Sequence, residues 1–184
     1  MTLMTRFFVA LHAACVLALL ALTVALGDEL PARIPLHFGA NGQIDGWTNR
    51  SSWYLLPGIG AATFVLMTGL VIALPSRPEL LNHPDKARLL RLPKTAQRAV
   101  IERITPVIAA MGLLVGLVFP VIQYAVWQGA HGRSTQWLGV TPFVLAGLPL
   151  LALPLLLTRL PREITRQEQA LGRDAAAATR PPRR

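Results

Sequence analysis

The pattern of apolar and polar positions divides the chain into four long apolar runs separated by polar segments. The runs cover residues 7–26, 54–74, 104–127 and 137–157. A helix of about twenty residues, rising 1.5 Å per residue, spans roughly 30 Å, the thickness of a bilayer's hydrocarbon core. The pattern therefore predicts an all-α membrane protein with four transmembrane helices and an ordered extracytoplasmic loop between the first two.

Prolines divide the third and fourth runs. The third run has two and the fourth has three: Pro106, Pro120, Pro142, Pro149 and Pro154. Proline lacks a backbone N–H, so it kinks a membrane helix and frees a carbonyl that another polar group must satisfy. Gln123 and Thr141 are available for this role, and the fourth span is expected to be the least regular. In the third run, Gly112 and Gly116 favour close helix packing within one chain.

The first run has a second interpretation, as a secretory signal peptide. Arg6 precedes it, and Ala25-Leu26-Gly27 is a weak small-x-small cleavage site. The apolar part of a signal peptide is shorter than this run, so a retained span is favoured. His12 within the run is either a tolerated neutral side chain or a proton relay, because intramembrane ionisable groups are functional candidates.

Residues 30–50, LPARIPLHFGANGQIDGWTNR, form the only long segment that is neither apolar nor basic. Pro31 and Pro35 favour extended chain around them. The Asn-Gly and Asp-Gly steps at Gly42 and Gly46 tolerate positive φ angles, so two closely spaced turns are expected to fold the segment back on itself.

Four residues of this loop are candidates for recognition of a peptide or an envelope component: His37, Asn41, Asp45 and Trp47. Binding residues concentrate on loops of fixed shape, and this loop is far longer than the roughly four to six residues that a simple connection needs. The alternatives are a loop that only plugs the bundle, a His37–Asp45 cation site, and Trp47 and Trp53 as anchors at the membrane interface. Two ligands are too few for a metal site, so no metal is expected.

Charge placement sets the expected orientation. The chain is 53% hydrophobic and 15% charged, with a net charge of +9. Segment 75–103 and the tail from residue 158 each carry seven basic residues, against two in 27–53 and one in 128–136. The positive-inside rule therefore predicts cytoplasmic termini and an external loop at 30–50. The basic charge suits anionic lipid headgroups, so the bilayer and not nucleic acid is the expected partner.

The basic segment between the second and third runs has local order of its own. Asn82 or His83 is expected to cap a short helix with Pro84 and Lys86 in its first turn. Leucines give this helix an apolar face that suits the cytoplasmic interface, and Pro93 ends it. Residues 95–103 should lead helically into the third span, and 162–171 could form an amphipathic turn. The residues after 172 are expected to be disordered.

The chain shows no catalytic triad, phosphate-binding loop or dinucleotide motif, so neither an enzyme nor a cofactor is expected. Its single cysteine, Cys15, can form no internal disulfide. The expected organisation is a two-helix module over 1–103, a second pair of transmembrane helices over 104–158, and a basic, partly disordered tail over 159–184. The module contains the outer loop at 30–50 and the basic cytoplasmic loop at 75–103.

Two motifs together resemble a bacterial inner-membrane family, the domain of unknown function 1648. The residues that carry the resemblance are Leu30-Pro31, Ile34-Pro35-x-His37-Phe38, Gly42, Asp45-Gly46-Trp47 and Arg50, then Asn82-x-Pro84-x-Lys86 and Leu92-Pro93. Arg50 stands where the family more often has lysine. The resemblance covers about half the chain and implies a relation to immunity proteins against a sporulation-delaying toxin peptide. Those proteins are longer and carry a further membrane domain that residues 104–184 do not resemble.

Two functions remain open. The first is a non-enzymatic, receptor- or immunity-like protein of the bacterial plasma membrane. Its outer loop would meet an extracytoplasmic peptide or envelope component, and its basic inner loop would meet a cytoplasmic protein partner. The second is a small transporter or channel subunit. A transport path needs polar lining, and the third and fourth spans offer only Thr105, Gln123, Tyr124 and Thr141, so the first function is preferred.

Overall fold

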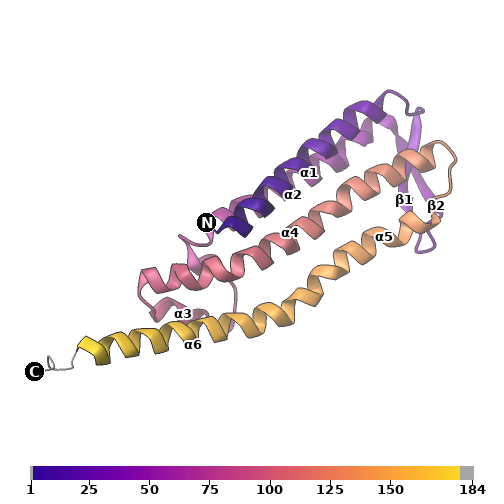
Figure 1. Cartoon of the computed structure of the whole chain (residues 1–184). Coiled ribbons are helices and arrows are strands. Elements are labelled where there is room, and N and C mark those ends of the chain that lie inside the picture. Colours follow the sequence, from indigo (N-terminus) through magenta and orange to yellow (C-terminus); the bar gives the residue numbers. More distant parts are fainter. Residues whose placement is uncertain (1, 179–184) are drawn as a thin grey trace, which may run out of the picture.

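The structure is a computed structural model that describes residues 2–178. Its long helices are α1 (Leu3–Gly27), α2 (Leu55–Ala73), α4 (Lys94–Ala130), α5 (Gln136–Gly147) and α6 (Leu153–Ala178). They form a bundle in which α1, α2, α4 and the joined α5–α6 segment run alternately up and down (Figure 1). Within the described chain, α1, α2, α4 and the joined α5–α6 segment are long and apolar enough to cross a membrane. The prediction of a helical protein with four spans is therefore confirmed.

The fourth crossing is the least regular, as its prolines predicted. α5 ends at Gly147, a 3₁₀ turn (η3, Leu148–Ala152) follows, and α6 then continues. Pro149 lies in the 3₁₀ turn, where its missing N–H breaks the α-helical hydrogen-bond ladder. In contrast, α4 is assigned as one helix through both Pro106 and Pro120.

Between α1 and α2 the chain forms an antiparallel hairpin of β1 (Arg33–Phe38) and β2 (Ile44–Asn49). Extended chain was predicted here. Gly42 makes the turn with a φ angle of 75°, and the Gly39 N–H donates to the Gln43 carbonyl over 2.8 Å. The expected second turn at Asp45-Gly46 is wrong, because these residues lie inside β2.

Gly46 has a packing role instead of a turning role. It pairs with His37 where the register of the two strands is irregular. A β-carbon at position 46 would lie 3.0 Å from the His37 β-carbon, which is closer than side chains normally approach. The glycine therefore allows the two strands to come together at this point.

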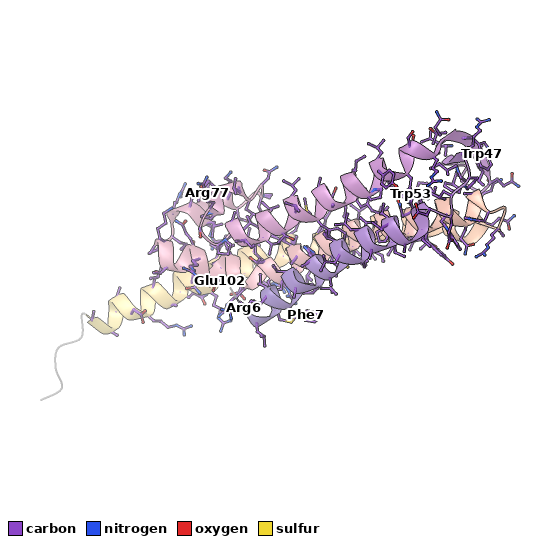
Figure 2. All side chains as sticks on the ribbon, turned by 90° about the horizontal axis from the view of Figure 1, so that it is seen from above. Arg6, Phe7, Trp47, Trp53, Arg77 and Glu102 are labelled. Carbon is purple, nitrogen blue, oxygen red and sulfur yellow. The ribbon has the colours of Figure 1, made fainter. Side chains whose placement is uncertain are left out.

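The bundle has two polar ends. We call the end that holds β1 and β2 the hairpin end, and the end that holds α3 (Lys86–Arg91) the basic end (Figure 1). Trp47 and Trp53 lie at the hairpin end, whereas Arg77 and Glu102 lie at the basic end (Figure 2). The chain enters α1 and leaves α6 at the basic end, as expected for four crossings (Figure 1).

An apolar core closes the basic end. Leu89 of α3 is fully buried and packs among side chains of α4 and α6, including Ile101 and Leu160. α3 begins at Lys86 after Asp85, so the predicted cap at Asn82 or His83, with Pro84 in the first turn, is wrong. Proline disfavours helical dihedral angles in the residue before it, and the helix therefore starts after Pro84.

Close contacts join the helices in the middle of the bundle. Gly112 and Gly116 of α4 lie against Met67 and Phe64 of α2, as predicted for packing within one chain. His12 of α1 is 1% exposed. Its Nδ1 lies 3.0 Å from the Thr68 hydroxyl, and its Nε2 lies 3.0 Å from the Ala109 carbonyl. Both ring nitrogens thus have partners, which accounts for a buried histidine without a proton relay.

The tail differs from its prediction. α6 continues without a break through Gly172 to Ala178, so the expectation of disorder directly after Gly172 is wrong. Alanine has the highest helix propensity, and the run 175–178 is all alanine. Residues 179–184, for which disorder was also predicted, lie outside the described residues.

Candidate functional site

The β-hairpin is packed onto the ends of the helices. Leu30 and Ile34 are buried with Trp53 and with Val126 of α4. At the tip of the hairpin, the buried Thr135 hydroxyl donates to the Gly42 carbonyl over 2.7 Å. These contacts show an ordered segment, as the prolines and glycines of the loop predicted.

Trp53 is part of this packing. It lies in a 3₁₀ turn (η1, Arg50–Tyr54) before α2, and it is only 2% exposed. Its indole N–H donates to the Thr23 carbonyl of α1 over 2.9 Å. The interpretation of Trp53 as an interface anchor is therefore wrong, because both its ring and its N–H are used inside the protein. Trp47 on β2 is 45% exposed and remains accessible.

His37 and Asp45 face one another across the hairpin, as expected. His37 Nδ1 lies 2.5 Å from Asp45 Oδ1, and the two side chains are 71% and 55% exposed. An ion pair or hydrogen bond this exposed contributes little to stability because water screens it. The carboxylate can only accept, so Nδ1–H of His37 donates to it, and Nε2 stays outside this pair.

The remaining loop residues hold the shape of the hairpin. The Asn41 side-chain oxygen accepts from the Gln43 N–H over 3.1 Å, which closes the turn beside Gly42. Pro35 of β1 pairs with Trp47, and Pro31 precedes β1. The candidates thus divide into a shape-holding group that includes Asn41 and an exposed group of His37, Asp45 and Trp47.

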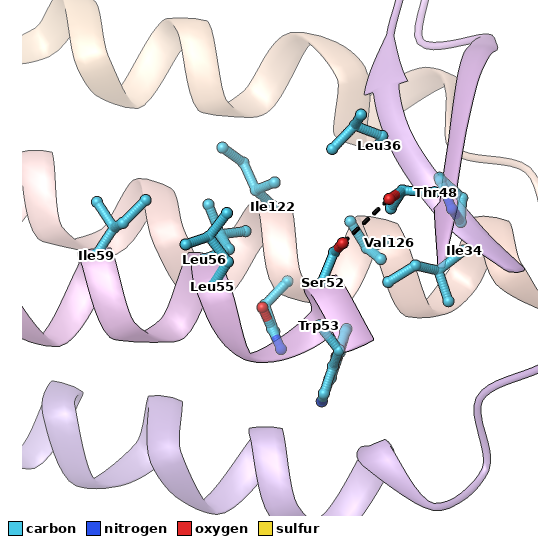
Figure 3. A pocket seen from close by; sticks show the side chains of 12 residues that line it. Ile34, Leu36, Thr48, Ser52, Trp53, Leu55, Leu56, Ile59, Ile122 and Val126 are labelled. Atoms are coloured by element: carbon cyan, nitrogen blue, oxygen red, sulfur yellow. Dashed lines mark hydrogen bonds between the residues drawn. The ribbon is translucent and has the colours of Figure 1, made fainter. Parts of the chain in front are cut away.

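An apolar groove of about 170 Å³ lies beside the hairpin, between η1, α2 and α4 (Figure 3). Ile34 and Leu36 of β1 form one wall, and Leu56 and Ile59 of α2 form another. The Thr48 and Ser52 hydroxyls at its edge are hydrogen-bonded to each other over 3.0 Å, the dashed line in Figure 3.

Gln123 of α4 also lines this groove. Its side chain is 1% exposed, and neither its amide nitrogen nor its amide oxygen has a hydrogen-bond partner among the described residues. The expectation that Gln123 satisfies a carbonyl freed by proline is therefore wrong. Sequence reasoning did not place this residue in a site, although a lone amide within an apolar run was the available signal.

A second hollow of about 320 Å³ lies between β1, α4 and α5. It is lined by Leu36, His37 and Phe38 of the strand and by Pro142 and Phe143 of α5. Leu36 lines both hollows. β1 thus borders two concave apolar surfaces, and His37 lines one of them.

The predicted motif of the basic segment is not part of this site. Asn82 and Pro84 precede α3, and Lys86 is its first residue, so all three lie at the basic end of the bundle. Within residues 2–178, no three His, Cys, Asp or Glu side chains are grouped so that they could hold a metal ion.

The fold and the site define a small multi-pass membrane protein in which a β-hairpin covers the end of a helical bundle beside an apolar groove. Residues 14–61 match the family described as "Domain of unknown function (DUF1648)". The match confirms the resemblance for most of α1, the hairpin and the start of α2. Residues 82–93 fall outside it. Searches of curated proteins and of solved structures found no match.

Proposed function

We propose that this protein is a non-enzymatic, receptor- or immunity-like membrane protein whose hairpin end recognises an extracytoplasmic peptide or envelope component. The unpartnered amide of Gln123, a residue that lines the apolar groove, is the observation that carries this proposal. Both amide atoms are buried, so a ligand would meet them once the side chain turns into the groove. A buried polar group without a partner costs about 1–3 kcal/mol, a cost that a ligand would relieve.

A peptide segment fits this groove better than a lipid chain does. A glutamine amide offers both a donor and an acceptor, and a peptide group supplies the complementary pair, whereas an ester carbonyl can satisfy only the donor. No charged residue lines the groove, so an uncharged, apolar segment is the expected occupant. His37 Nε2 and Trp47 would contact the part of the ligand that lies outside the groove.

The proposal includes an orientation. The basic end would face the cytoplasm of a bacterial plasma membrane and could bind a cytoplasmic protein, because the seven basic residues of 75–103 lie there. A cysteine placed at Asn41 should react with an impermeant maleimide added to intact cells, and one placed at Arg88 should not. The reverse labelling would overturn this orientation.

The recognition proposal can be tested by photo-crosslinking in the native host. A benzoylphenylalanine at Leu36, which is 64% exposed and lines the groove, should give an adduct with a peptide or envelope component. Ile72, which is 49% exposed on α2 away from the hairpin, is the matched control and should give lipid adducts only.

A second variant connects the adduct to the groove. Gln123→Met preserves the size of the side chain and removes the amide, so the Leu36 adduct should disappear while the amount of protein in the membrane stays unchanged. Identical adducts at Leu36 and Ile72, or an adduct that is insensitive to Gln123→Met, would refute recognition at this site.

No observation favours the transport alternative. Thr105 donates to the Ile101 carbonyl of its own helix, and the Tyr124 hydroxyl accepts from Gln128. Neither group extends a polar path from Gln123 through the apolar interior of the described bundle.

A further inference from the structure

A second groove lies at the basic end and is separate from the recognition site. α4 forms its floor and packs against both α1 and α6, which flank α4 in Figure 1. The groove has a volume of about 470 Å³, and its walls are apolar, with Phe8 of α1, Val107 of α4 and Leu155 of α6 among them.

Arginines line this groove as well. Arg103 of α4 and Arg159 of α6 belong both to it and to an adjoining cleft of about 370 Å³. The cleft also contains Arg162 and Glu163. Three guanidinium groups therefore face one carboxylate, which gives the cleft a net charge of +2.

The carboxylate in the cleft is already paired. Arg103 donates to Glu163 over 2.7 Å. Within residues 2–178, Arg159 and Arg162 form no ion pair, and both side chains are exposed. Two guanidinium groups thus remain for an anion, and the planar guanidinium fork suits the oxygens of a phosphate.

The positions along the chain place these arginines at a membrane boundary. Arg103 directly precedes the third apolar run, and Arg159 follows the fourth with only Thr158 between them. An apolar groove within the spans that ends at unpaired arginines complements a molecule with an anionic head and a hydrocarbon chain. A soluble phosphate would leave the apolar groove unfilled, and a zwitterionic lipid would bring an ammonium group beside the arginines that offsets the charge of its phosphate.

We propose that this groove binds one anionic phospholipid, with an acyl chain along Phe8, Val107 and Leu155 and the phosphate on the guanidinium groups of Arg159 and Arg162. Basic pockets between membrane helices are suited to anionic lipid headgroups. This site is independent of the hairpin end and would hold α6 against α1 through the lipid.

The test uses the full chain in nanodiscs that contain equal amounts of phosphatidylglycerol and phosphatidylcholine. Native mass spectrometry then measures the ratio of the two lipids that stay bound to the released protein. Phosphatidylglycerol should predominate, and the double variant Arg159→Gln, Arg162→Gln should lower the ratio about tenfold. The matched control Arg166→Gln, Arg173→Gln removes the same charge from α6 outside the cleft and should leave the ratio unchanged.

Two further experiments distinguish binding of the lipid's acyl chain from binding of its headgroup. Val107→Trp fills the apolar groove, keeps the arginines and should also reduce the bound phosphatidylglycerol. Soluble glycerol 3-phosphate should not displace the lipid. Equal retention of both lipids, an equal loss in the two double variants, or displacement by glycerol 3-phosphate would each overturn the proposal.

Discussion

Two buried glutamines on the same helix show how the ends of this molecule differ. Gln97 at the basic end is 3% exposed, and its amide nitrogen donates to the Leu90 and Leu92 carbonyls over 3.1 and 2.7 Å. Gln123 at the hairpin end is equally buried, but its amide has no partner. The first residue holds α3 against α4, whereas the second makes no hydrogen bond within the described residues and could make one with a ligand under the proposed function.

Other polar contacts at the two ends of the bundle differ in the same way. At the basic end, Arg88 of α3 is bound to Glu168 and Thr165 of α6, and a closed apolar core lies beneath. At the hairpin end, the polar pair His37–Asp45 is exposed and the groove is open. The polar groups named here at the basic end are paired within the protein, whereas those at the hairpin end are unpaired or exposed; His83 Nε2, which is buried without a partner just before α3, is an exception at the basic end.

The largest effect on stability is expected from the core of the basic end. Leu89→Ala should lower the free energy of unfolding by about 2–5 kcal/mol, because it leaves a cavity at a fully buried position. Leu90→Ala, at a residue that is 38% exposed, should cost much less. Thermal unfolding of both variants in detergent measures the difference. Equal losses would show that α3 is not packed as described.

Loss of the packing of the hairpin should lower the stability by a smaller amount. Alanine substitutions at two glycines separate this packing from the effect of backbone strain. Gly42 and Gly132 both have positive φ angles, of 75° and 70°. An alanine at either position therefore costs about 1–2 kcal/mol of backbone strain. Only at Gly42 would the new β-carbon also meet Gln136, at 2.6 Å, which adds about 1–3 kcal/mol of overpacking.

Gly42→Ala should accordingly unfold at a lower temperature than Gly132→Ala in the same detergent. If the two variants unfold together, the hairpin tip is not packed on the start of α5. The hairpin end would then be a mobile loop, and its contrast with the basic end would have a different origin.

The smallest effect concerns the ion pair between α3 and α6. The hydrogen bond from Arg88 lowers the pKa of Glu168 below its ordinary value of 4.5. The folded state thus binds this proton more weakly than the unfolded state does. The stabilisation is present above pH 4.5 and is lost as the pH falls through the lowered pKa.

Glu168→Gln should remove this part of the acid dependence of stability. The shift is expected to be small, because both groups are exposed to water. Comparison of acid unfolding curves for the natural protein and the variant measures it. A variant that becomes less stable by the same amount at neutral and at acidic pH would contradict the assignment.

Much of the fold could be predicted from sequence because its signals are local. Apolar runs gave the spans, three prolines indicated the irregular fourth crossing, and Pro31 and Pro35 indicated extended chain. Even the contact between the His37 and Asp45 side chains could be predicted, because the short segment that contains both folds back on itself. Each of these features depends on residues that are close together in the chain.

The features that were missed depend on distant partners. The indole of Trp53 is buried because its N–H meets Thr23 on another helix, which no local pattern reveals. Gly46 is needed for strand pairing and not for a turn, which becomes visible only with the register of His37. The absence of a partner for the Gln123 amide can likewise be recognised only when all the side chains around it, which come from separate elements, are known.

The melting temperatures of Gln123→Met and Gln97→Met, measured in the same detergent, test the central claim most directly. Removal of an amide that has no partner should leave the melting temperature unchanged or raise it, because methionine fills a similar volume without unpaired polar atoms. Gln97→Met leaves two carbonyls unpaired and should lower the stability by about 1–3 kcal/mol. If Gln123→Met is destabilised as much as Gln97→Met, Gln123 serves the fold, and the hairpin-end groove loses the observation that marks it as a binding site.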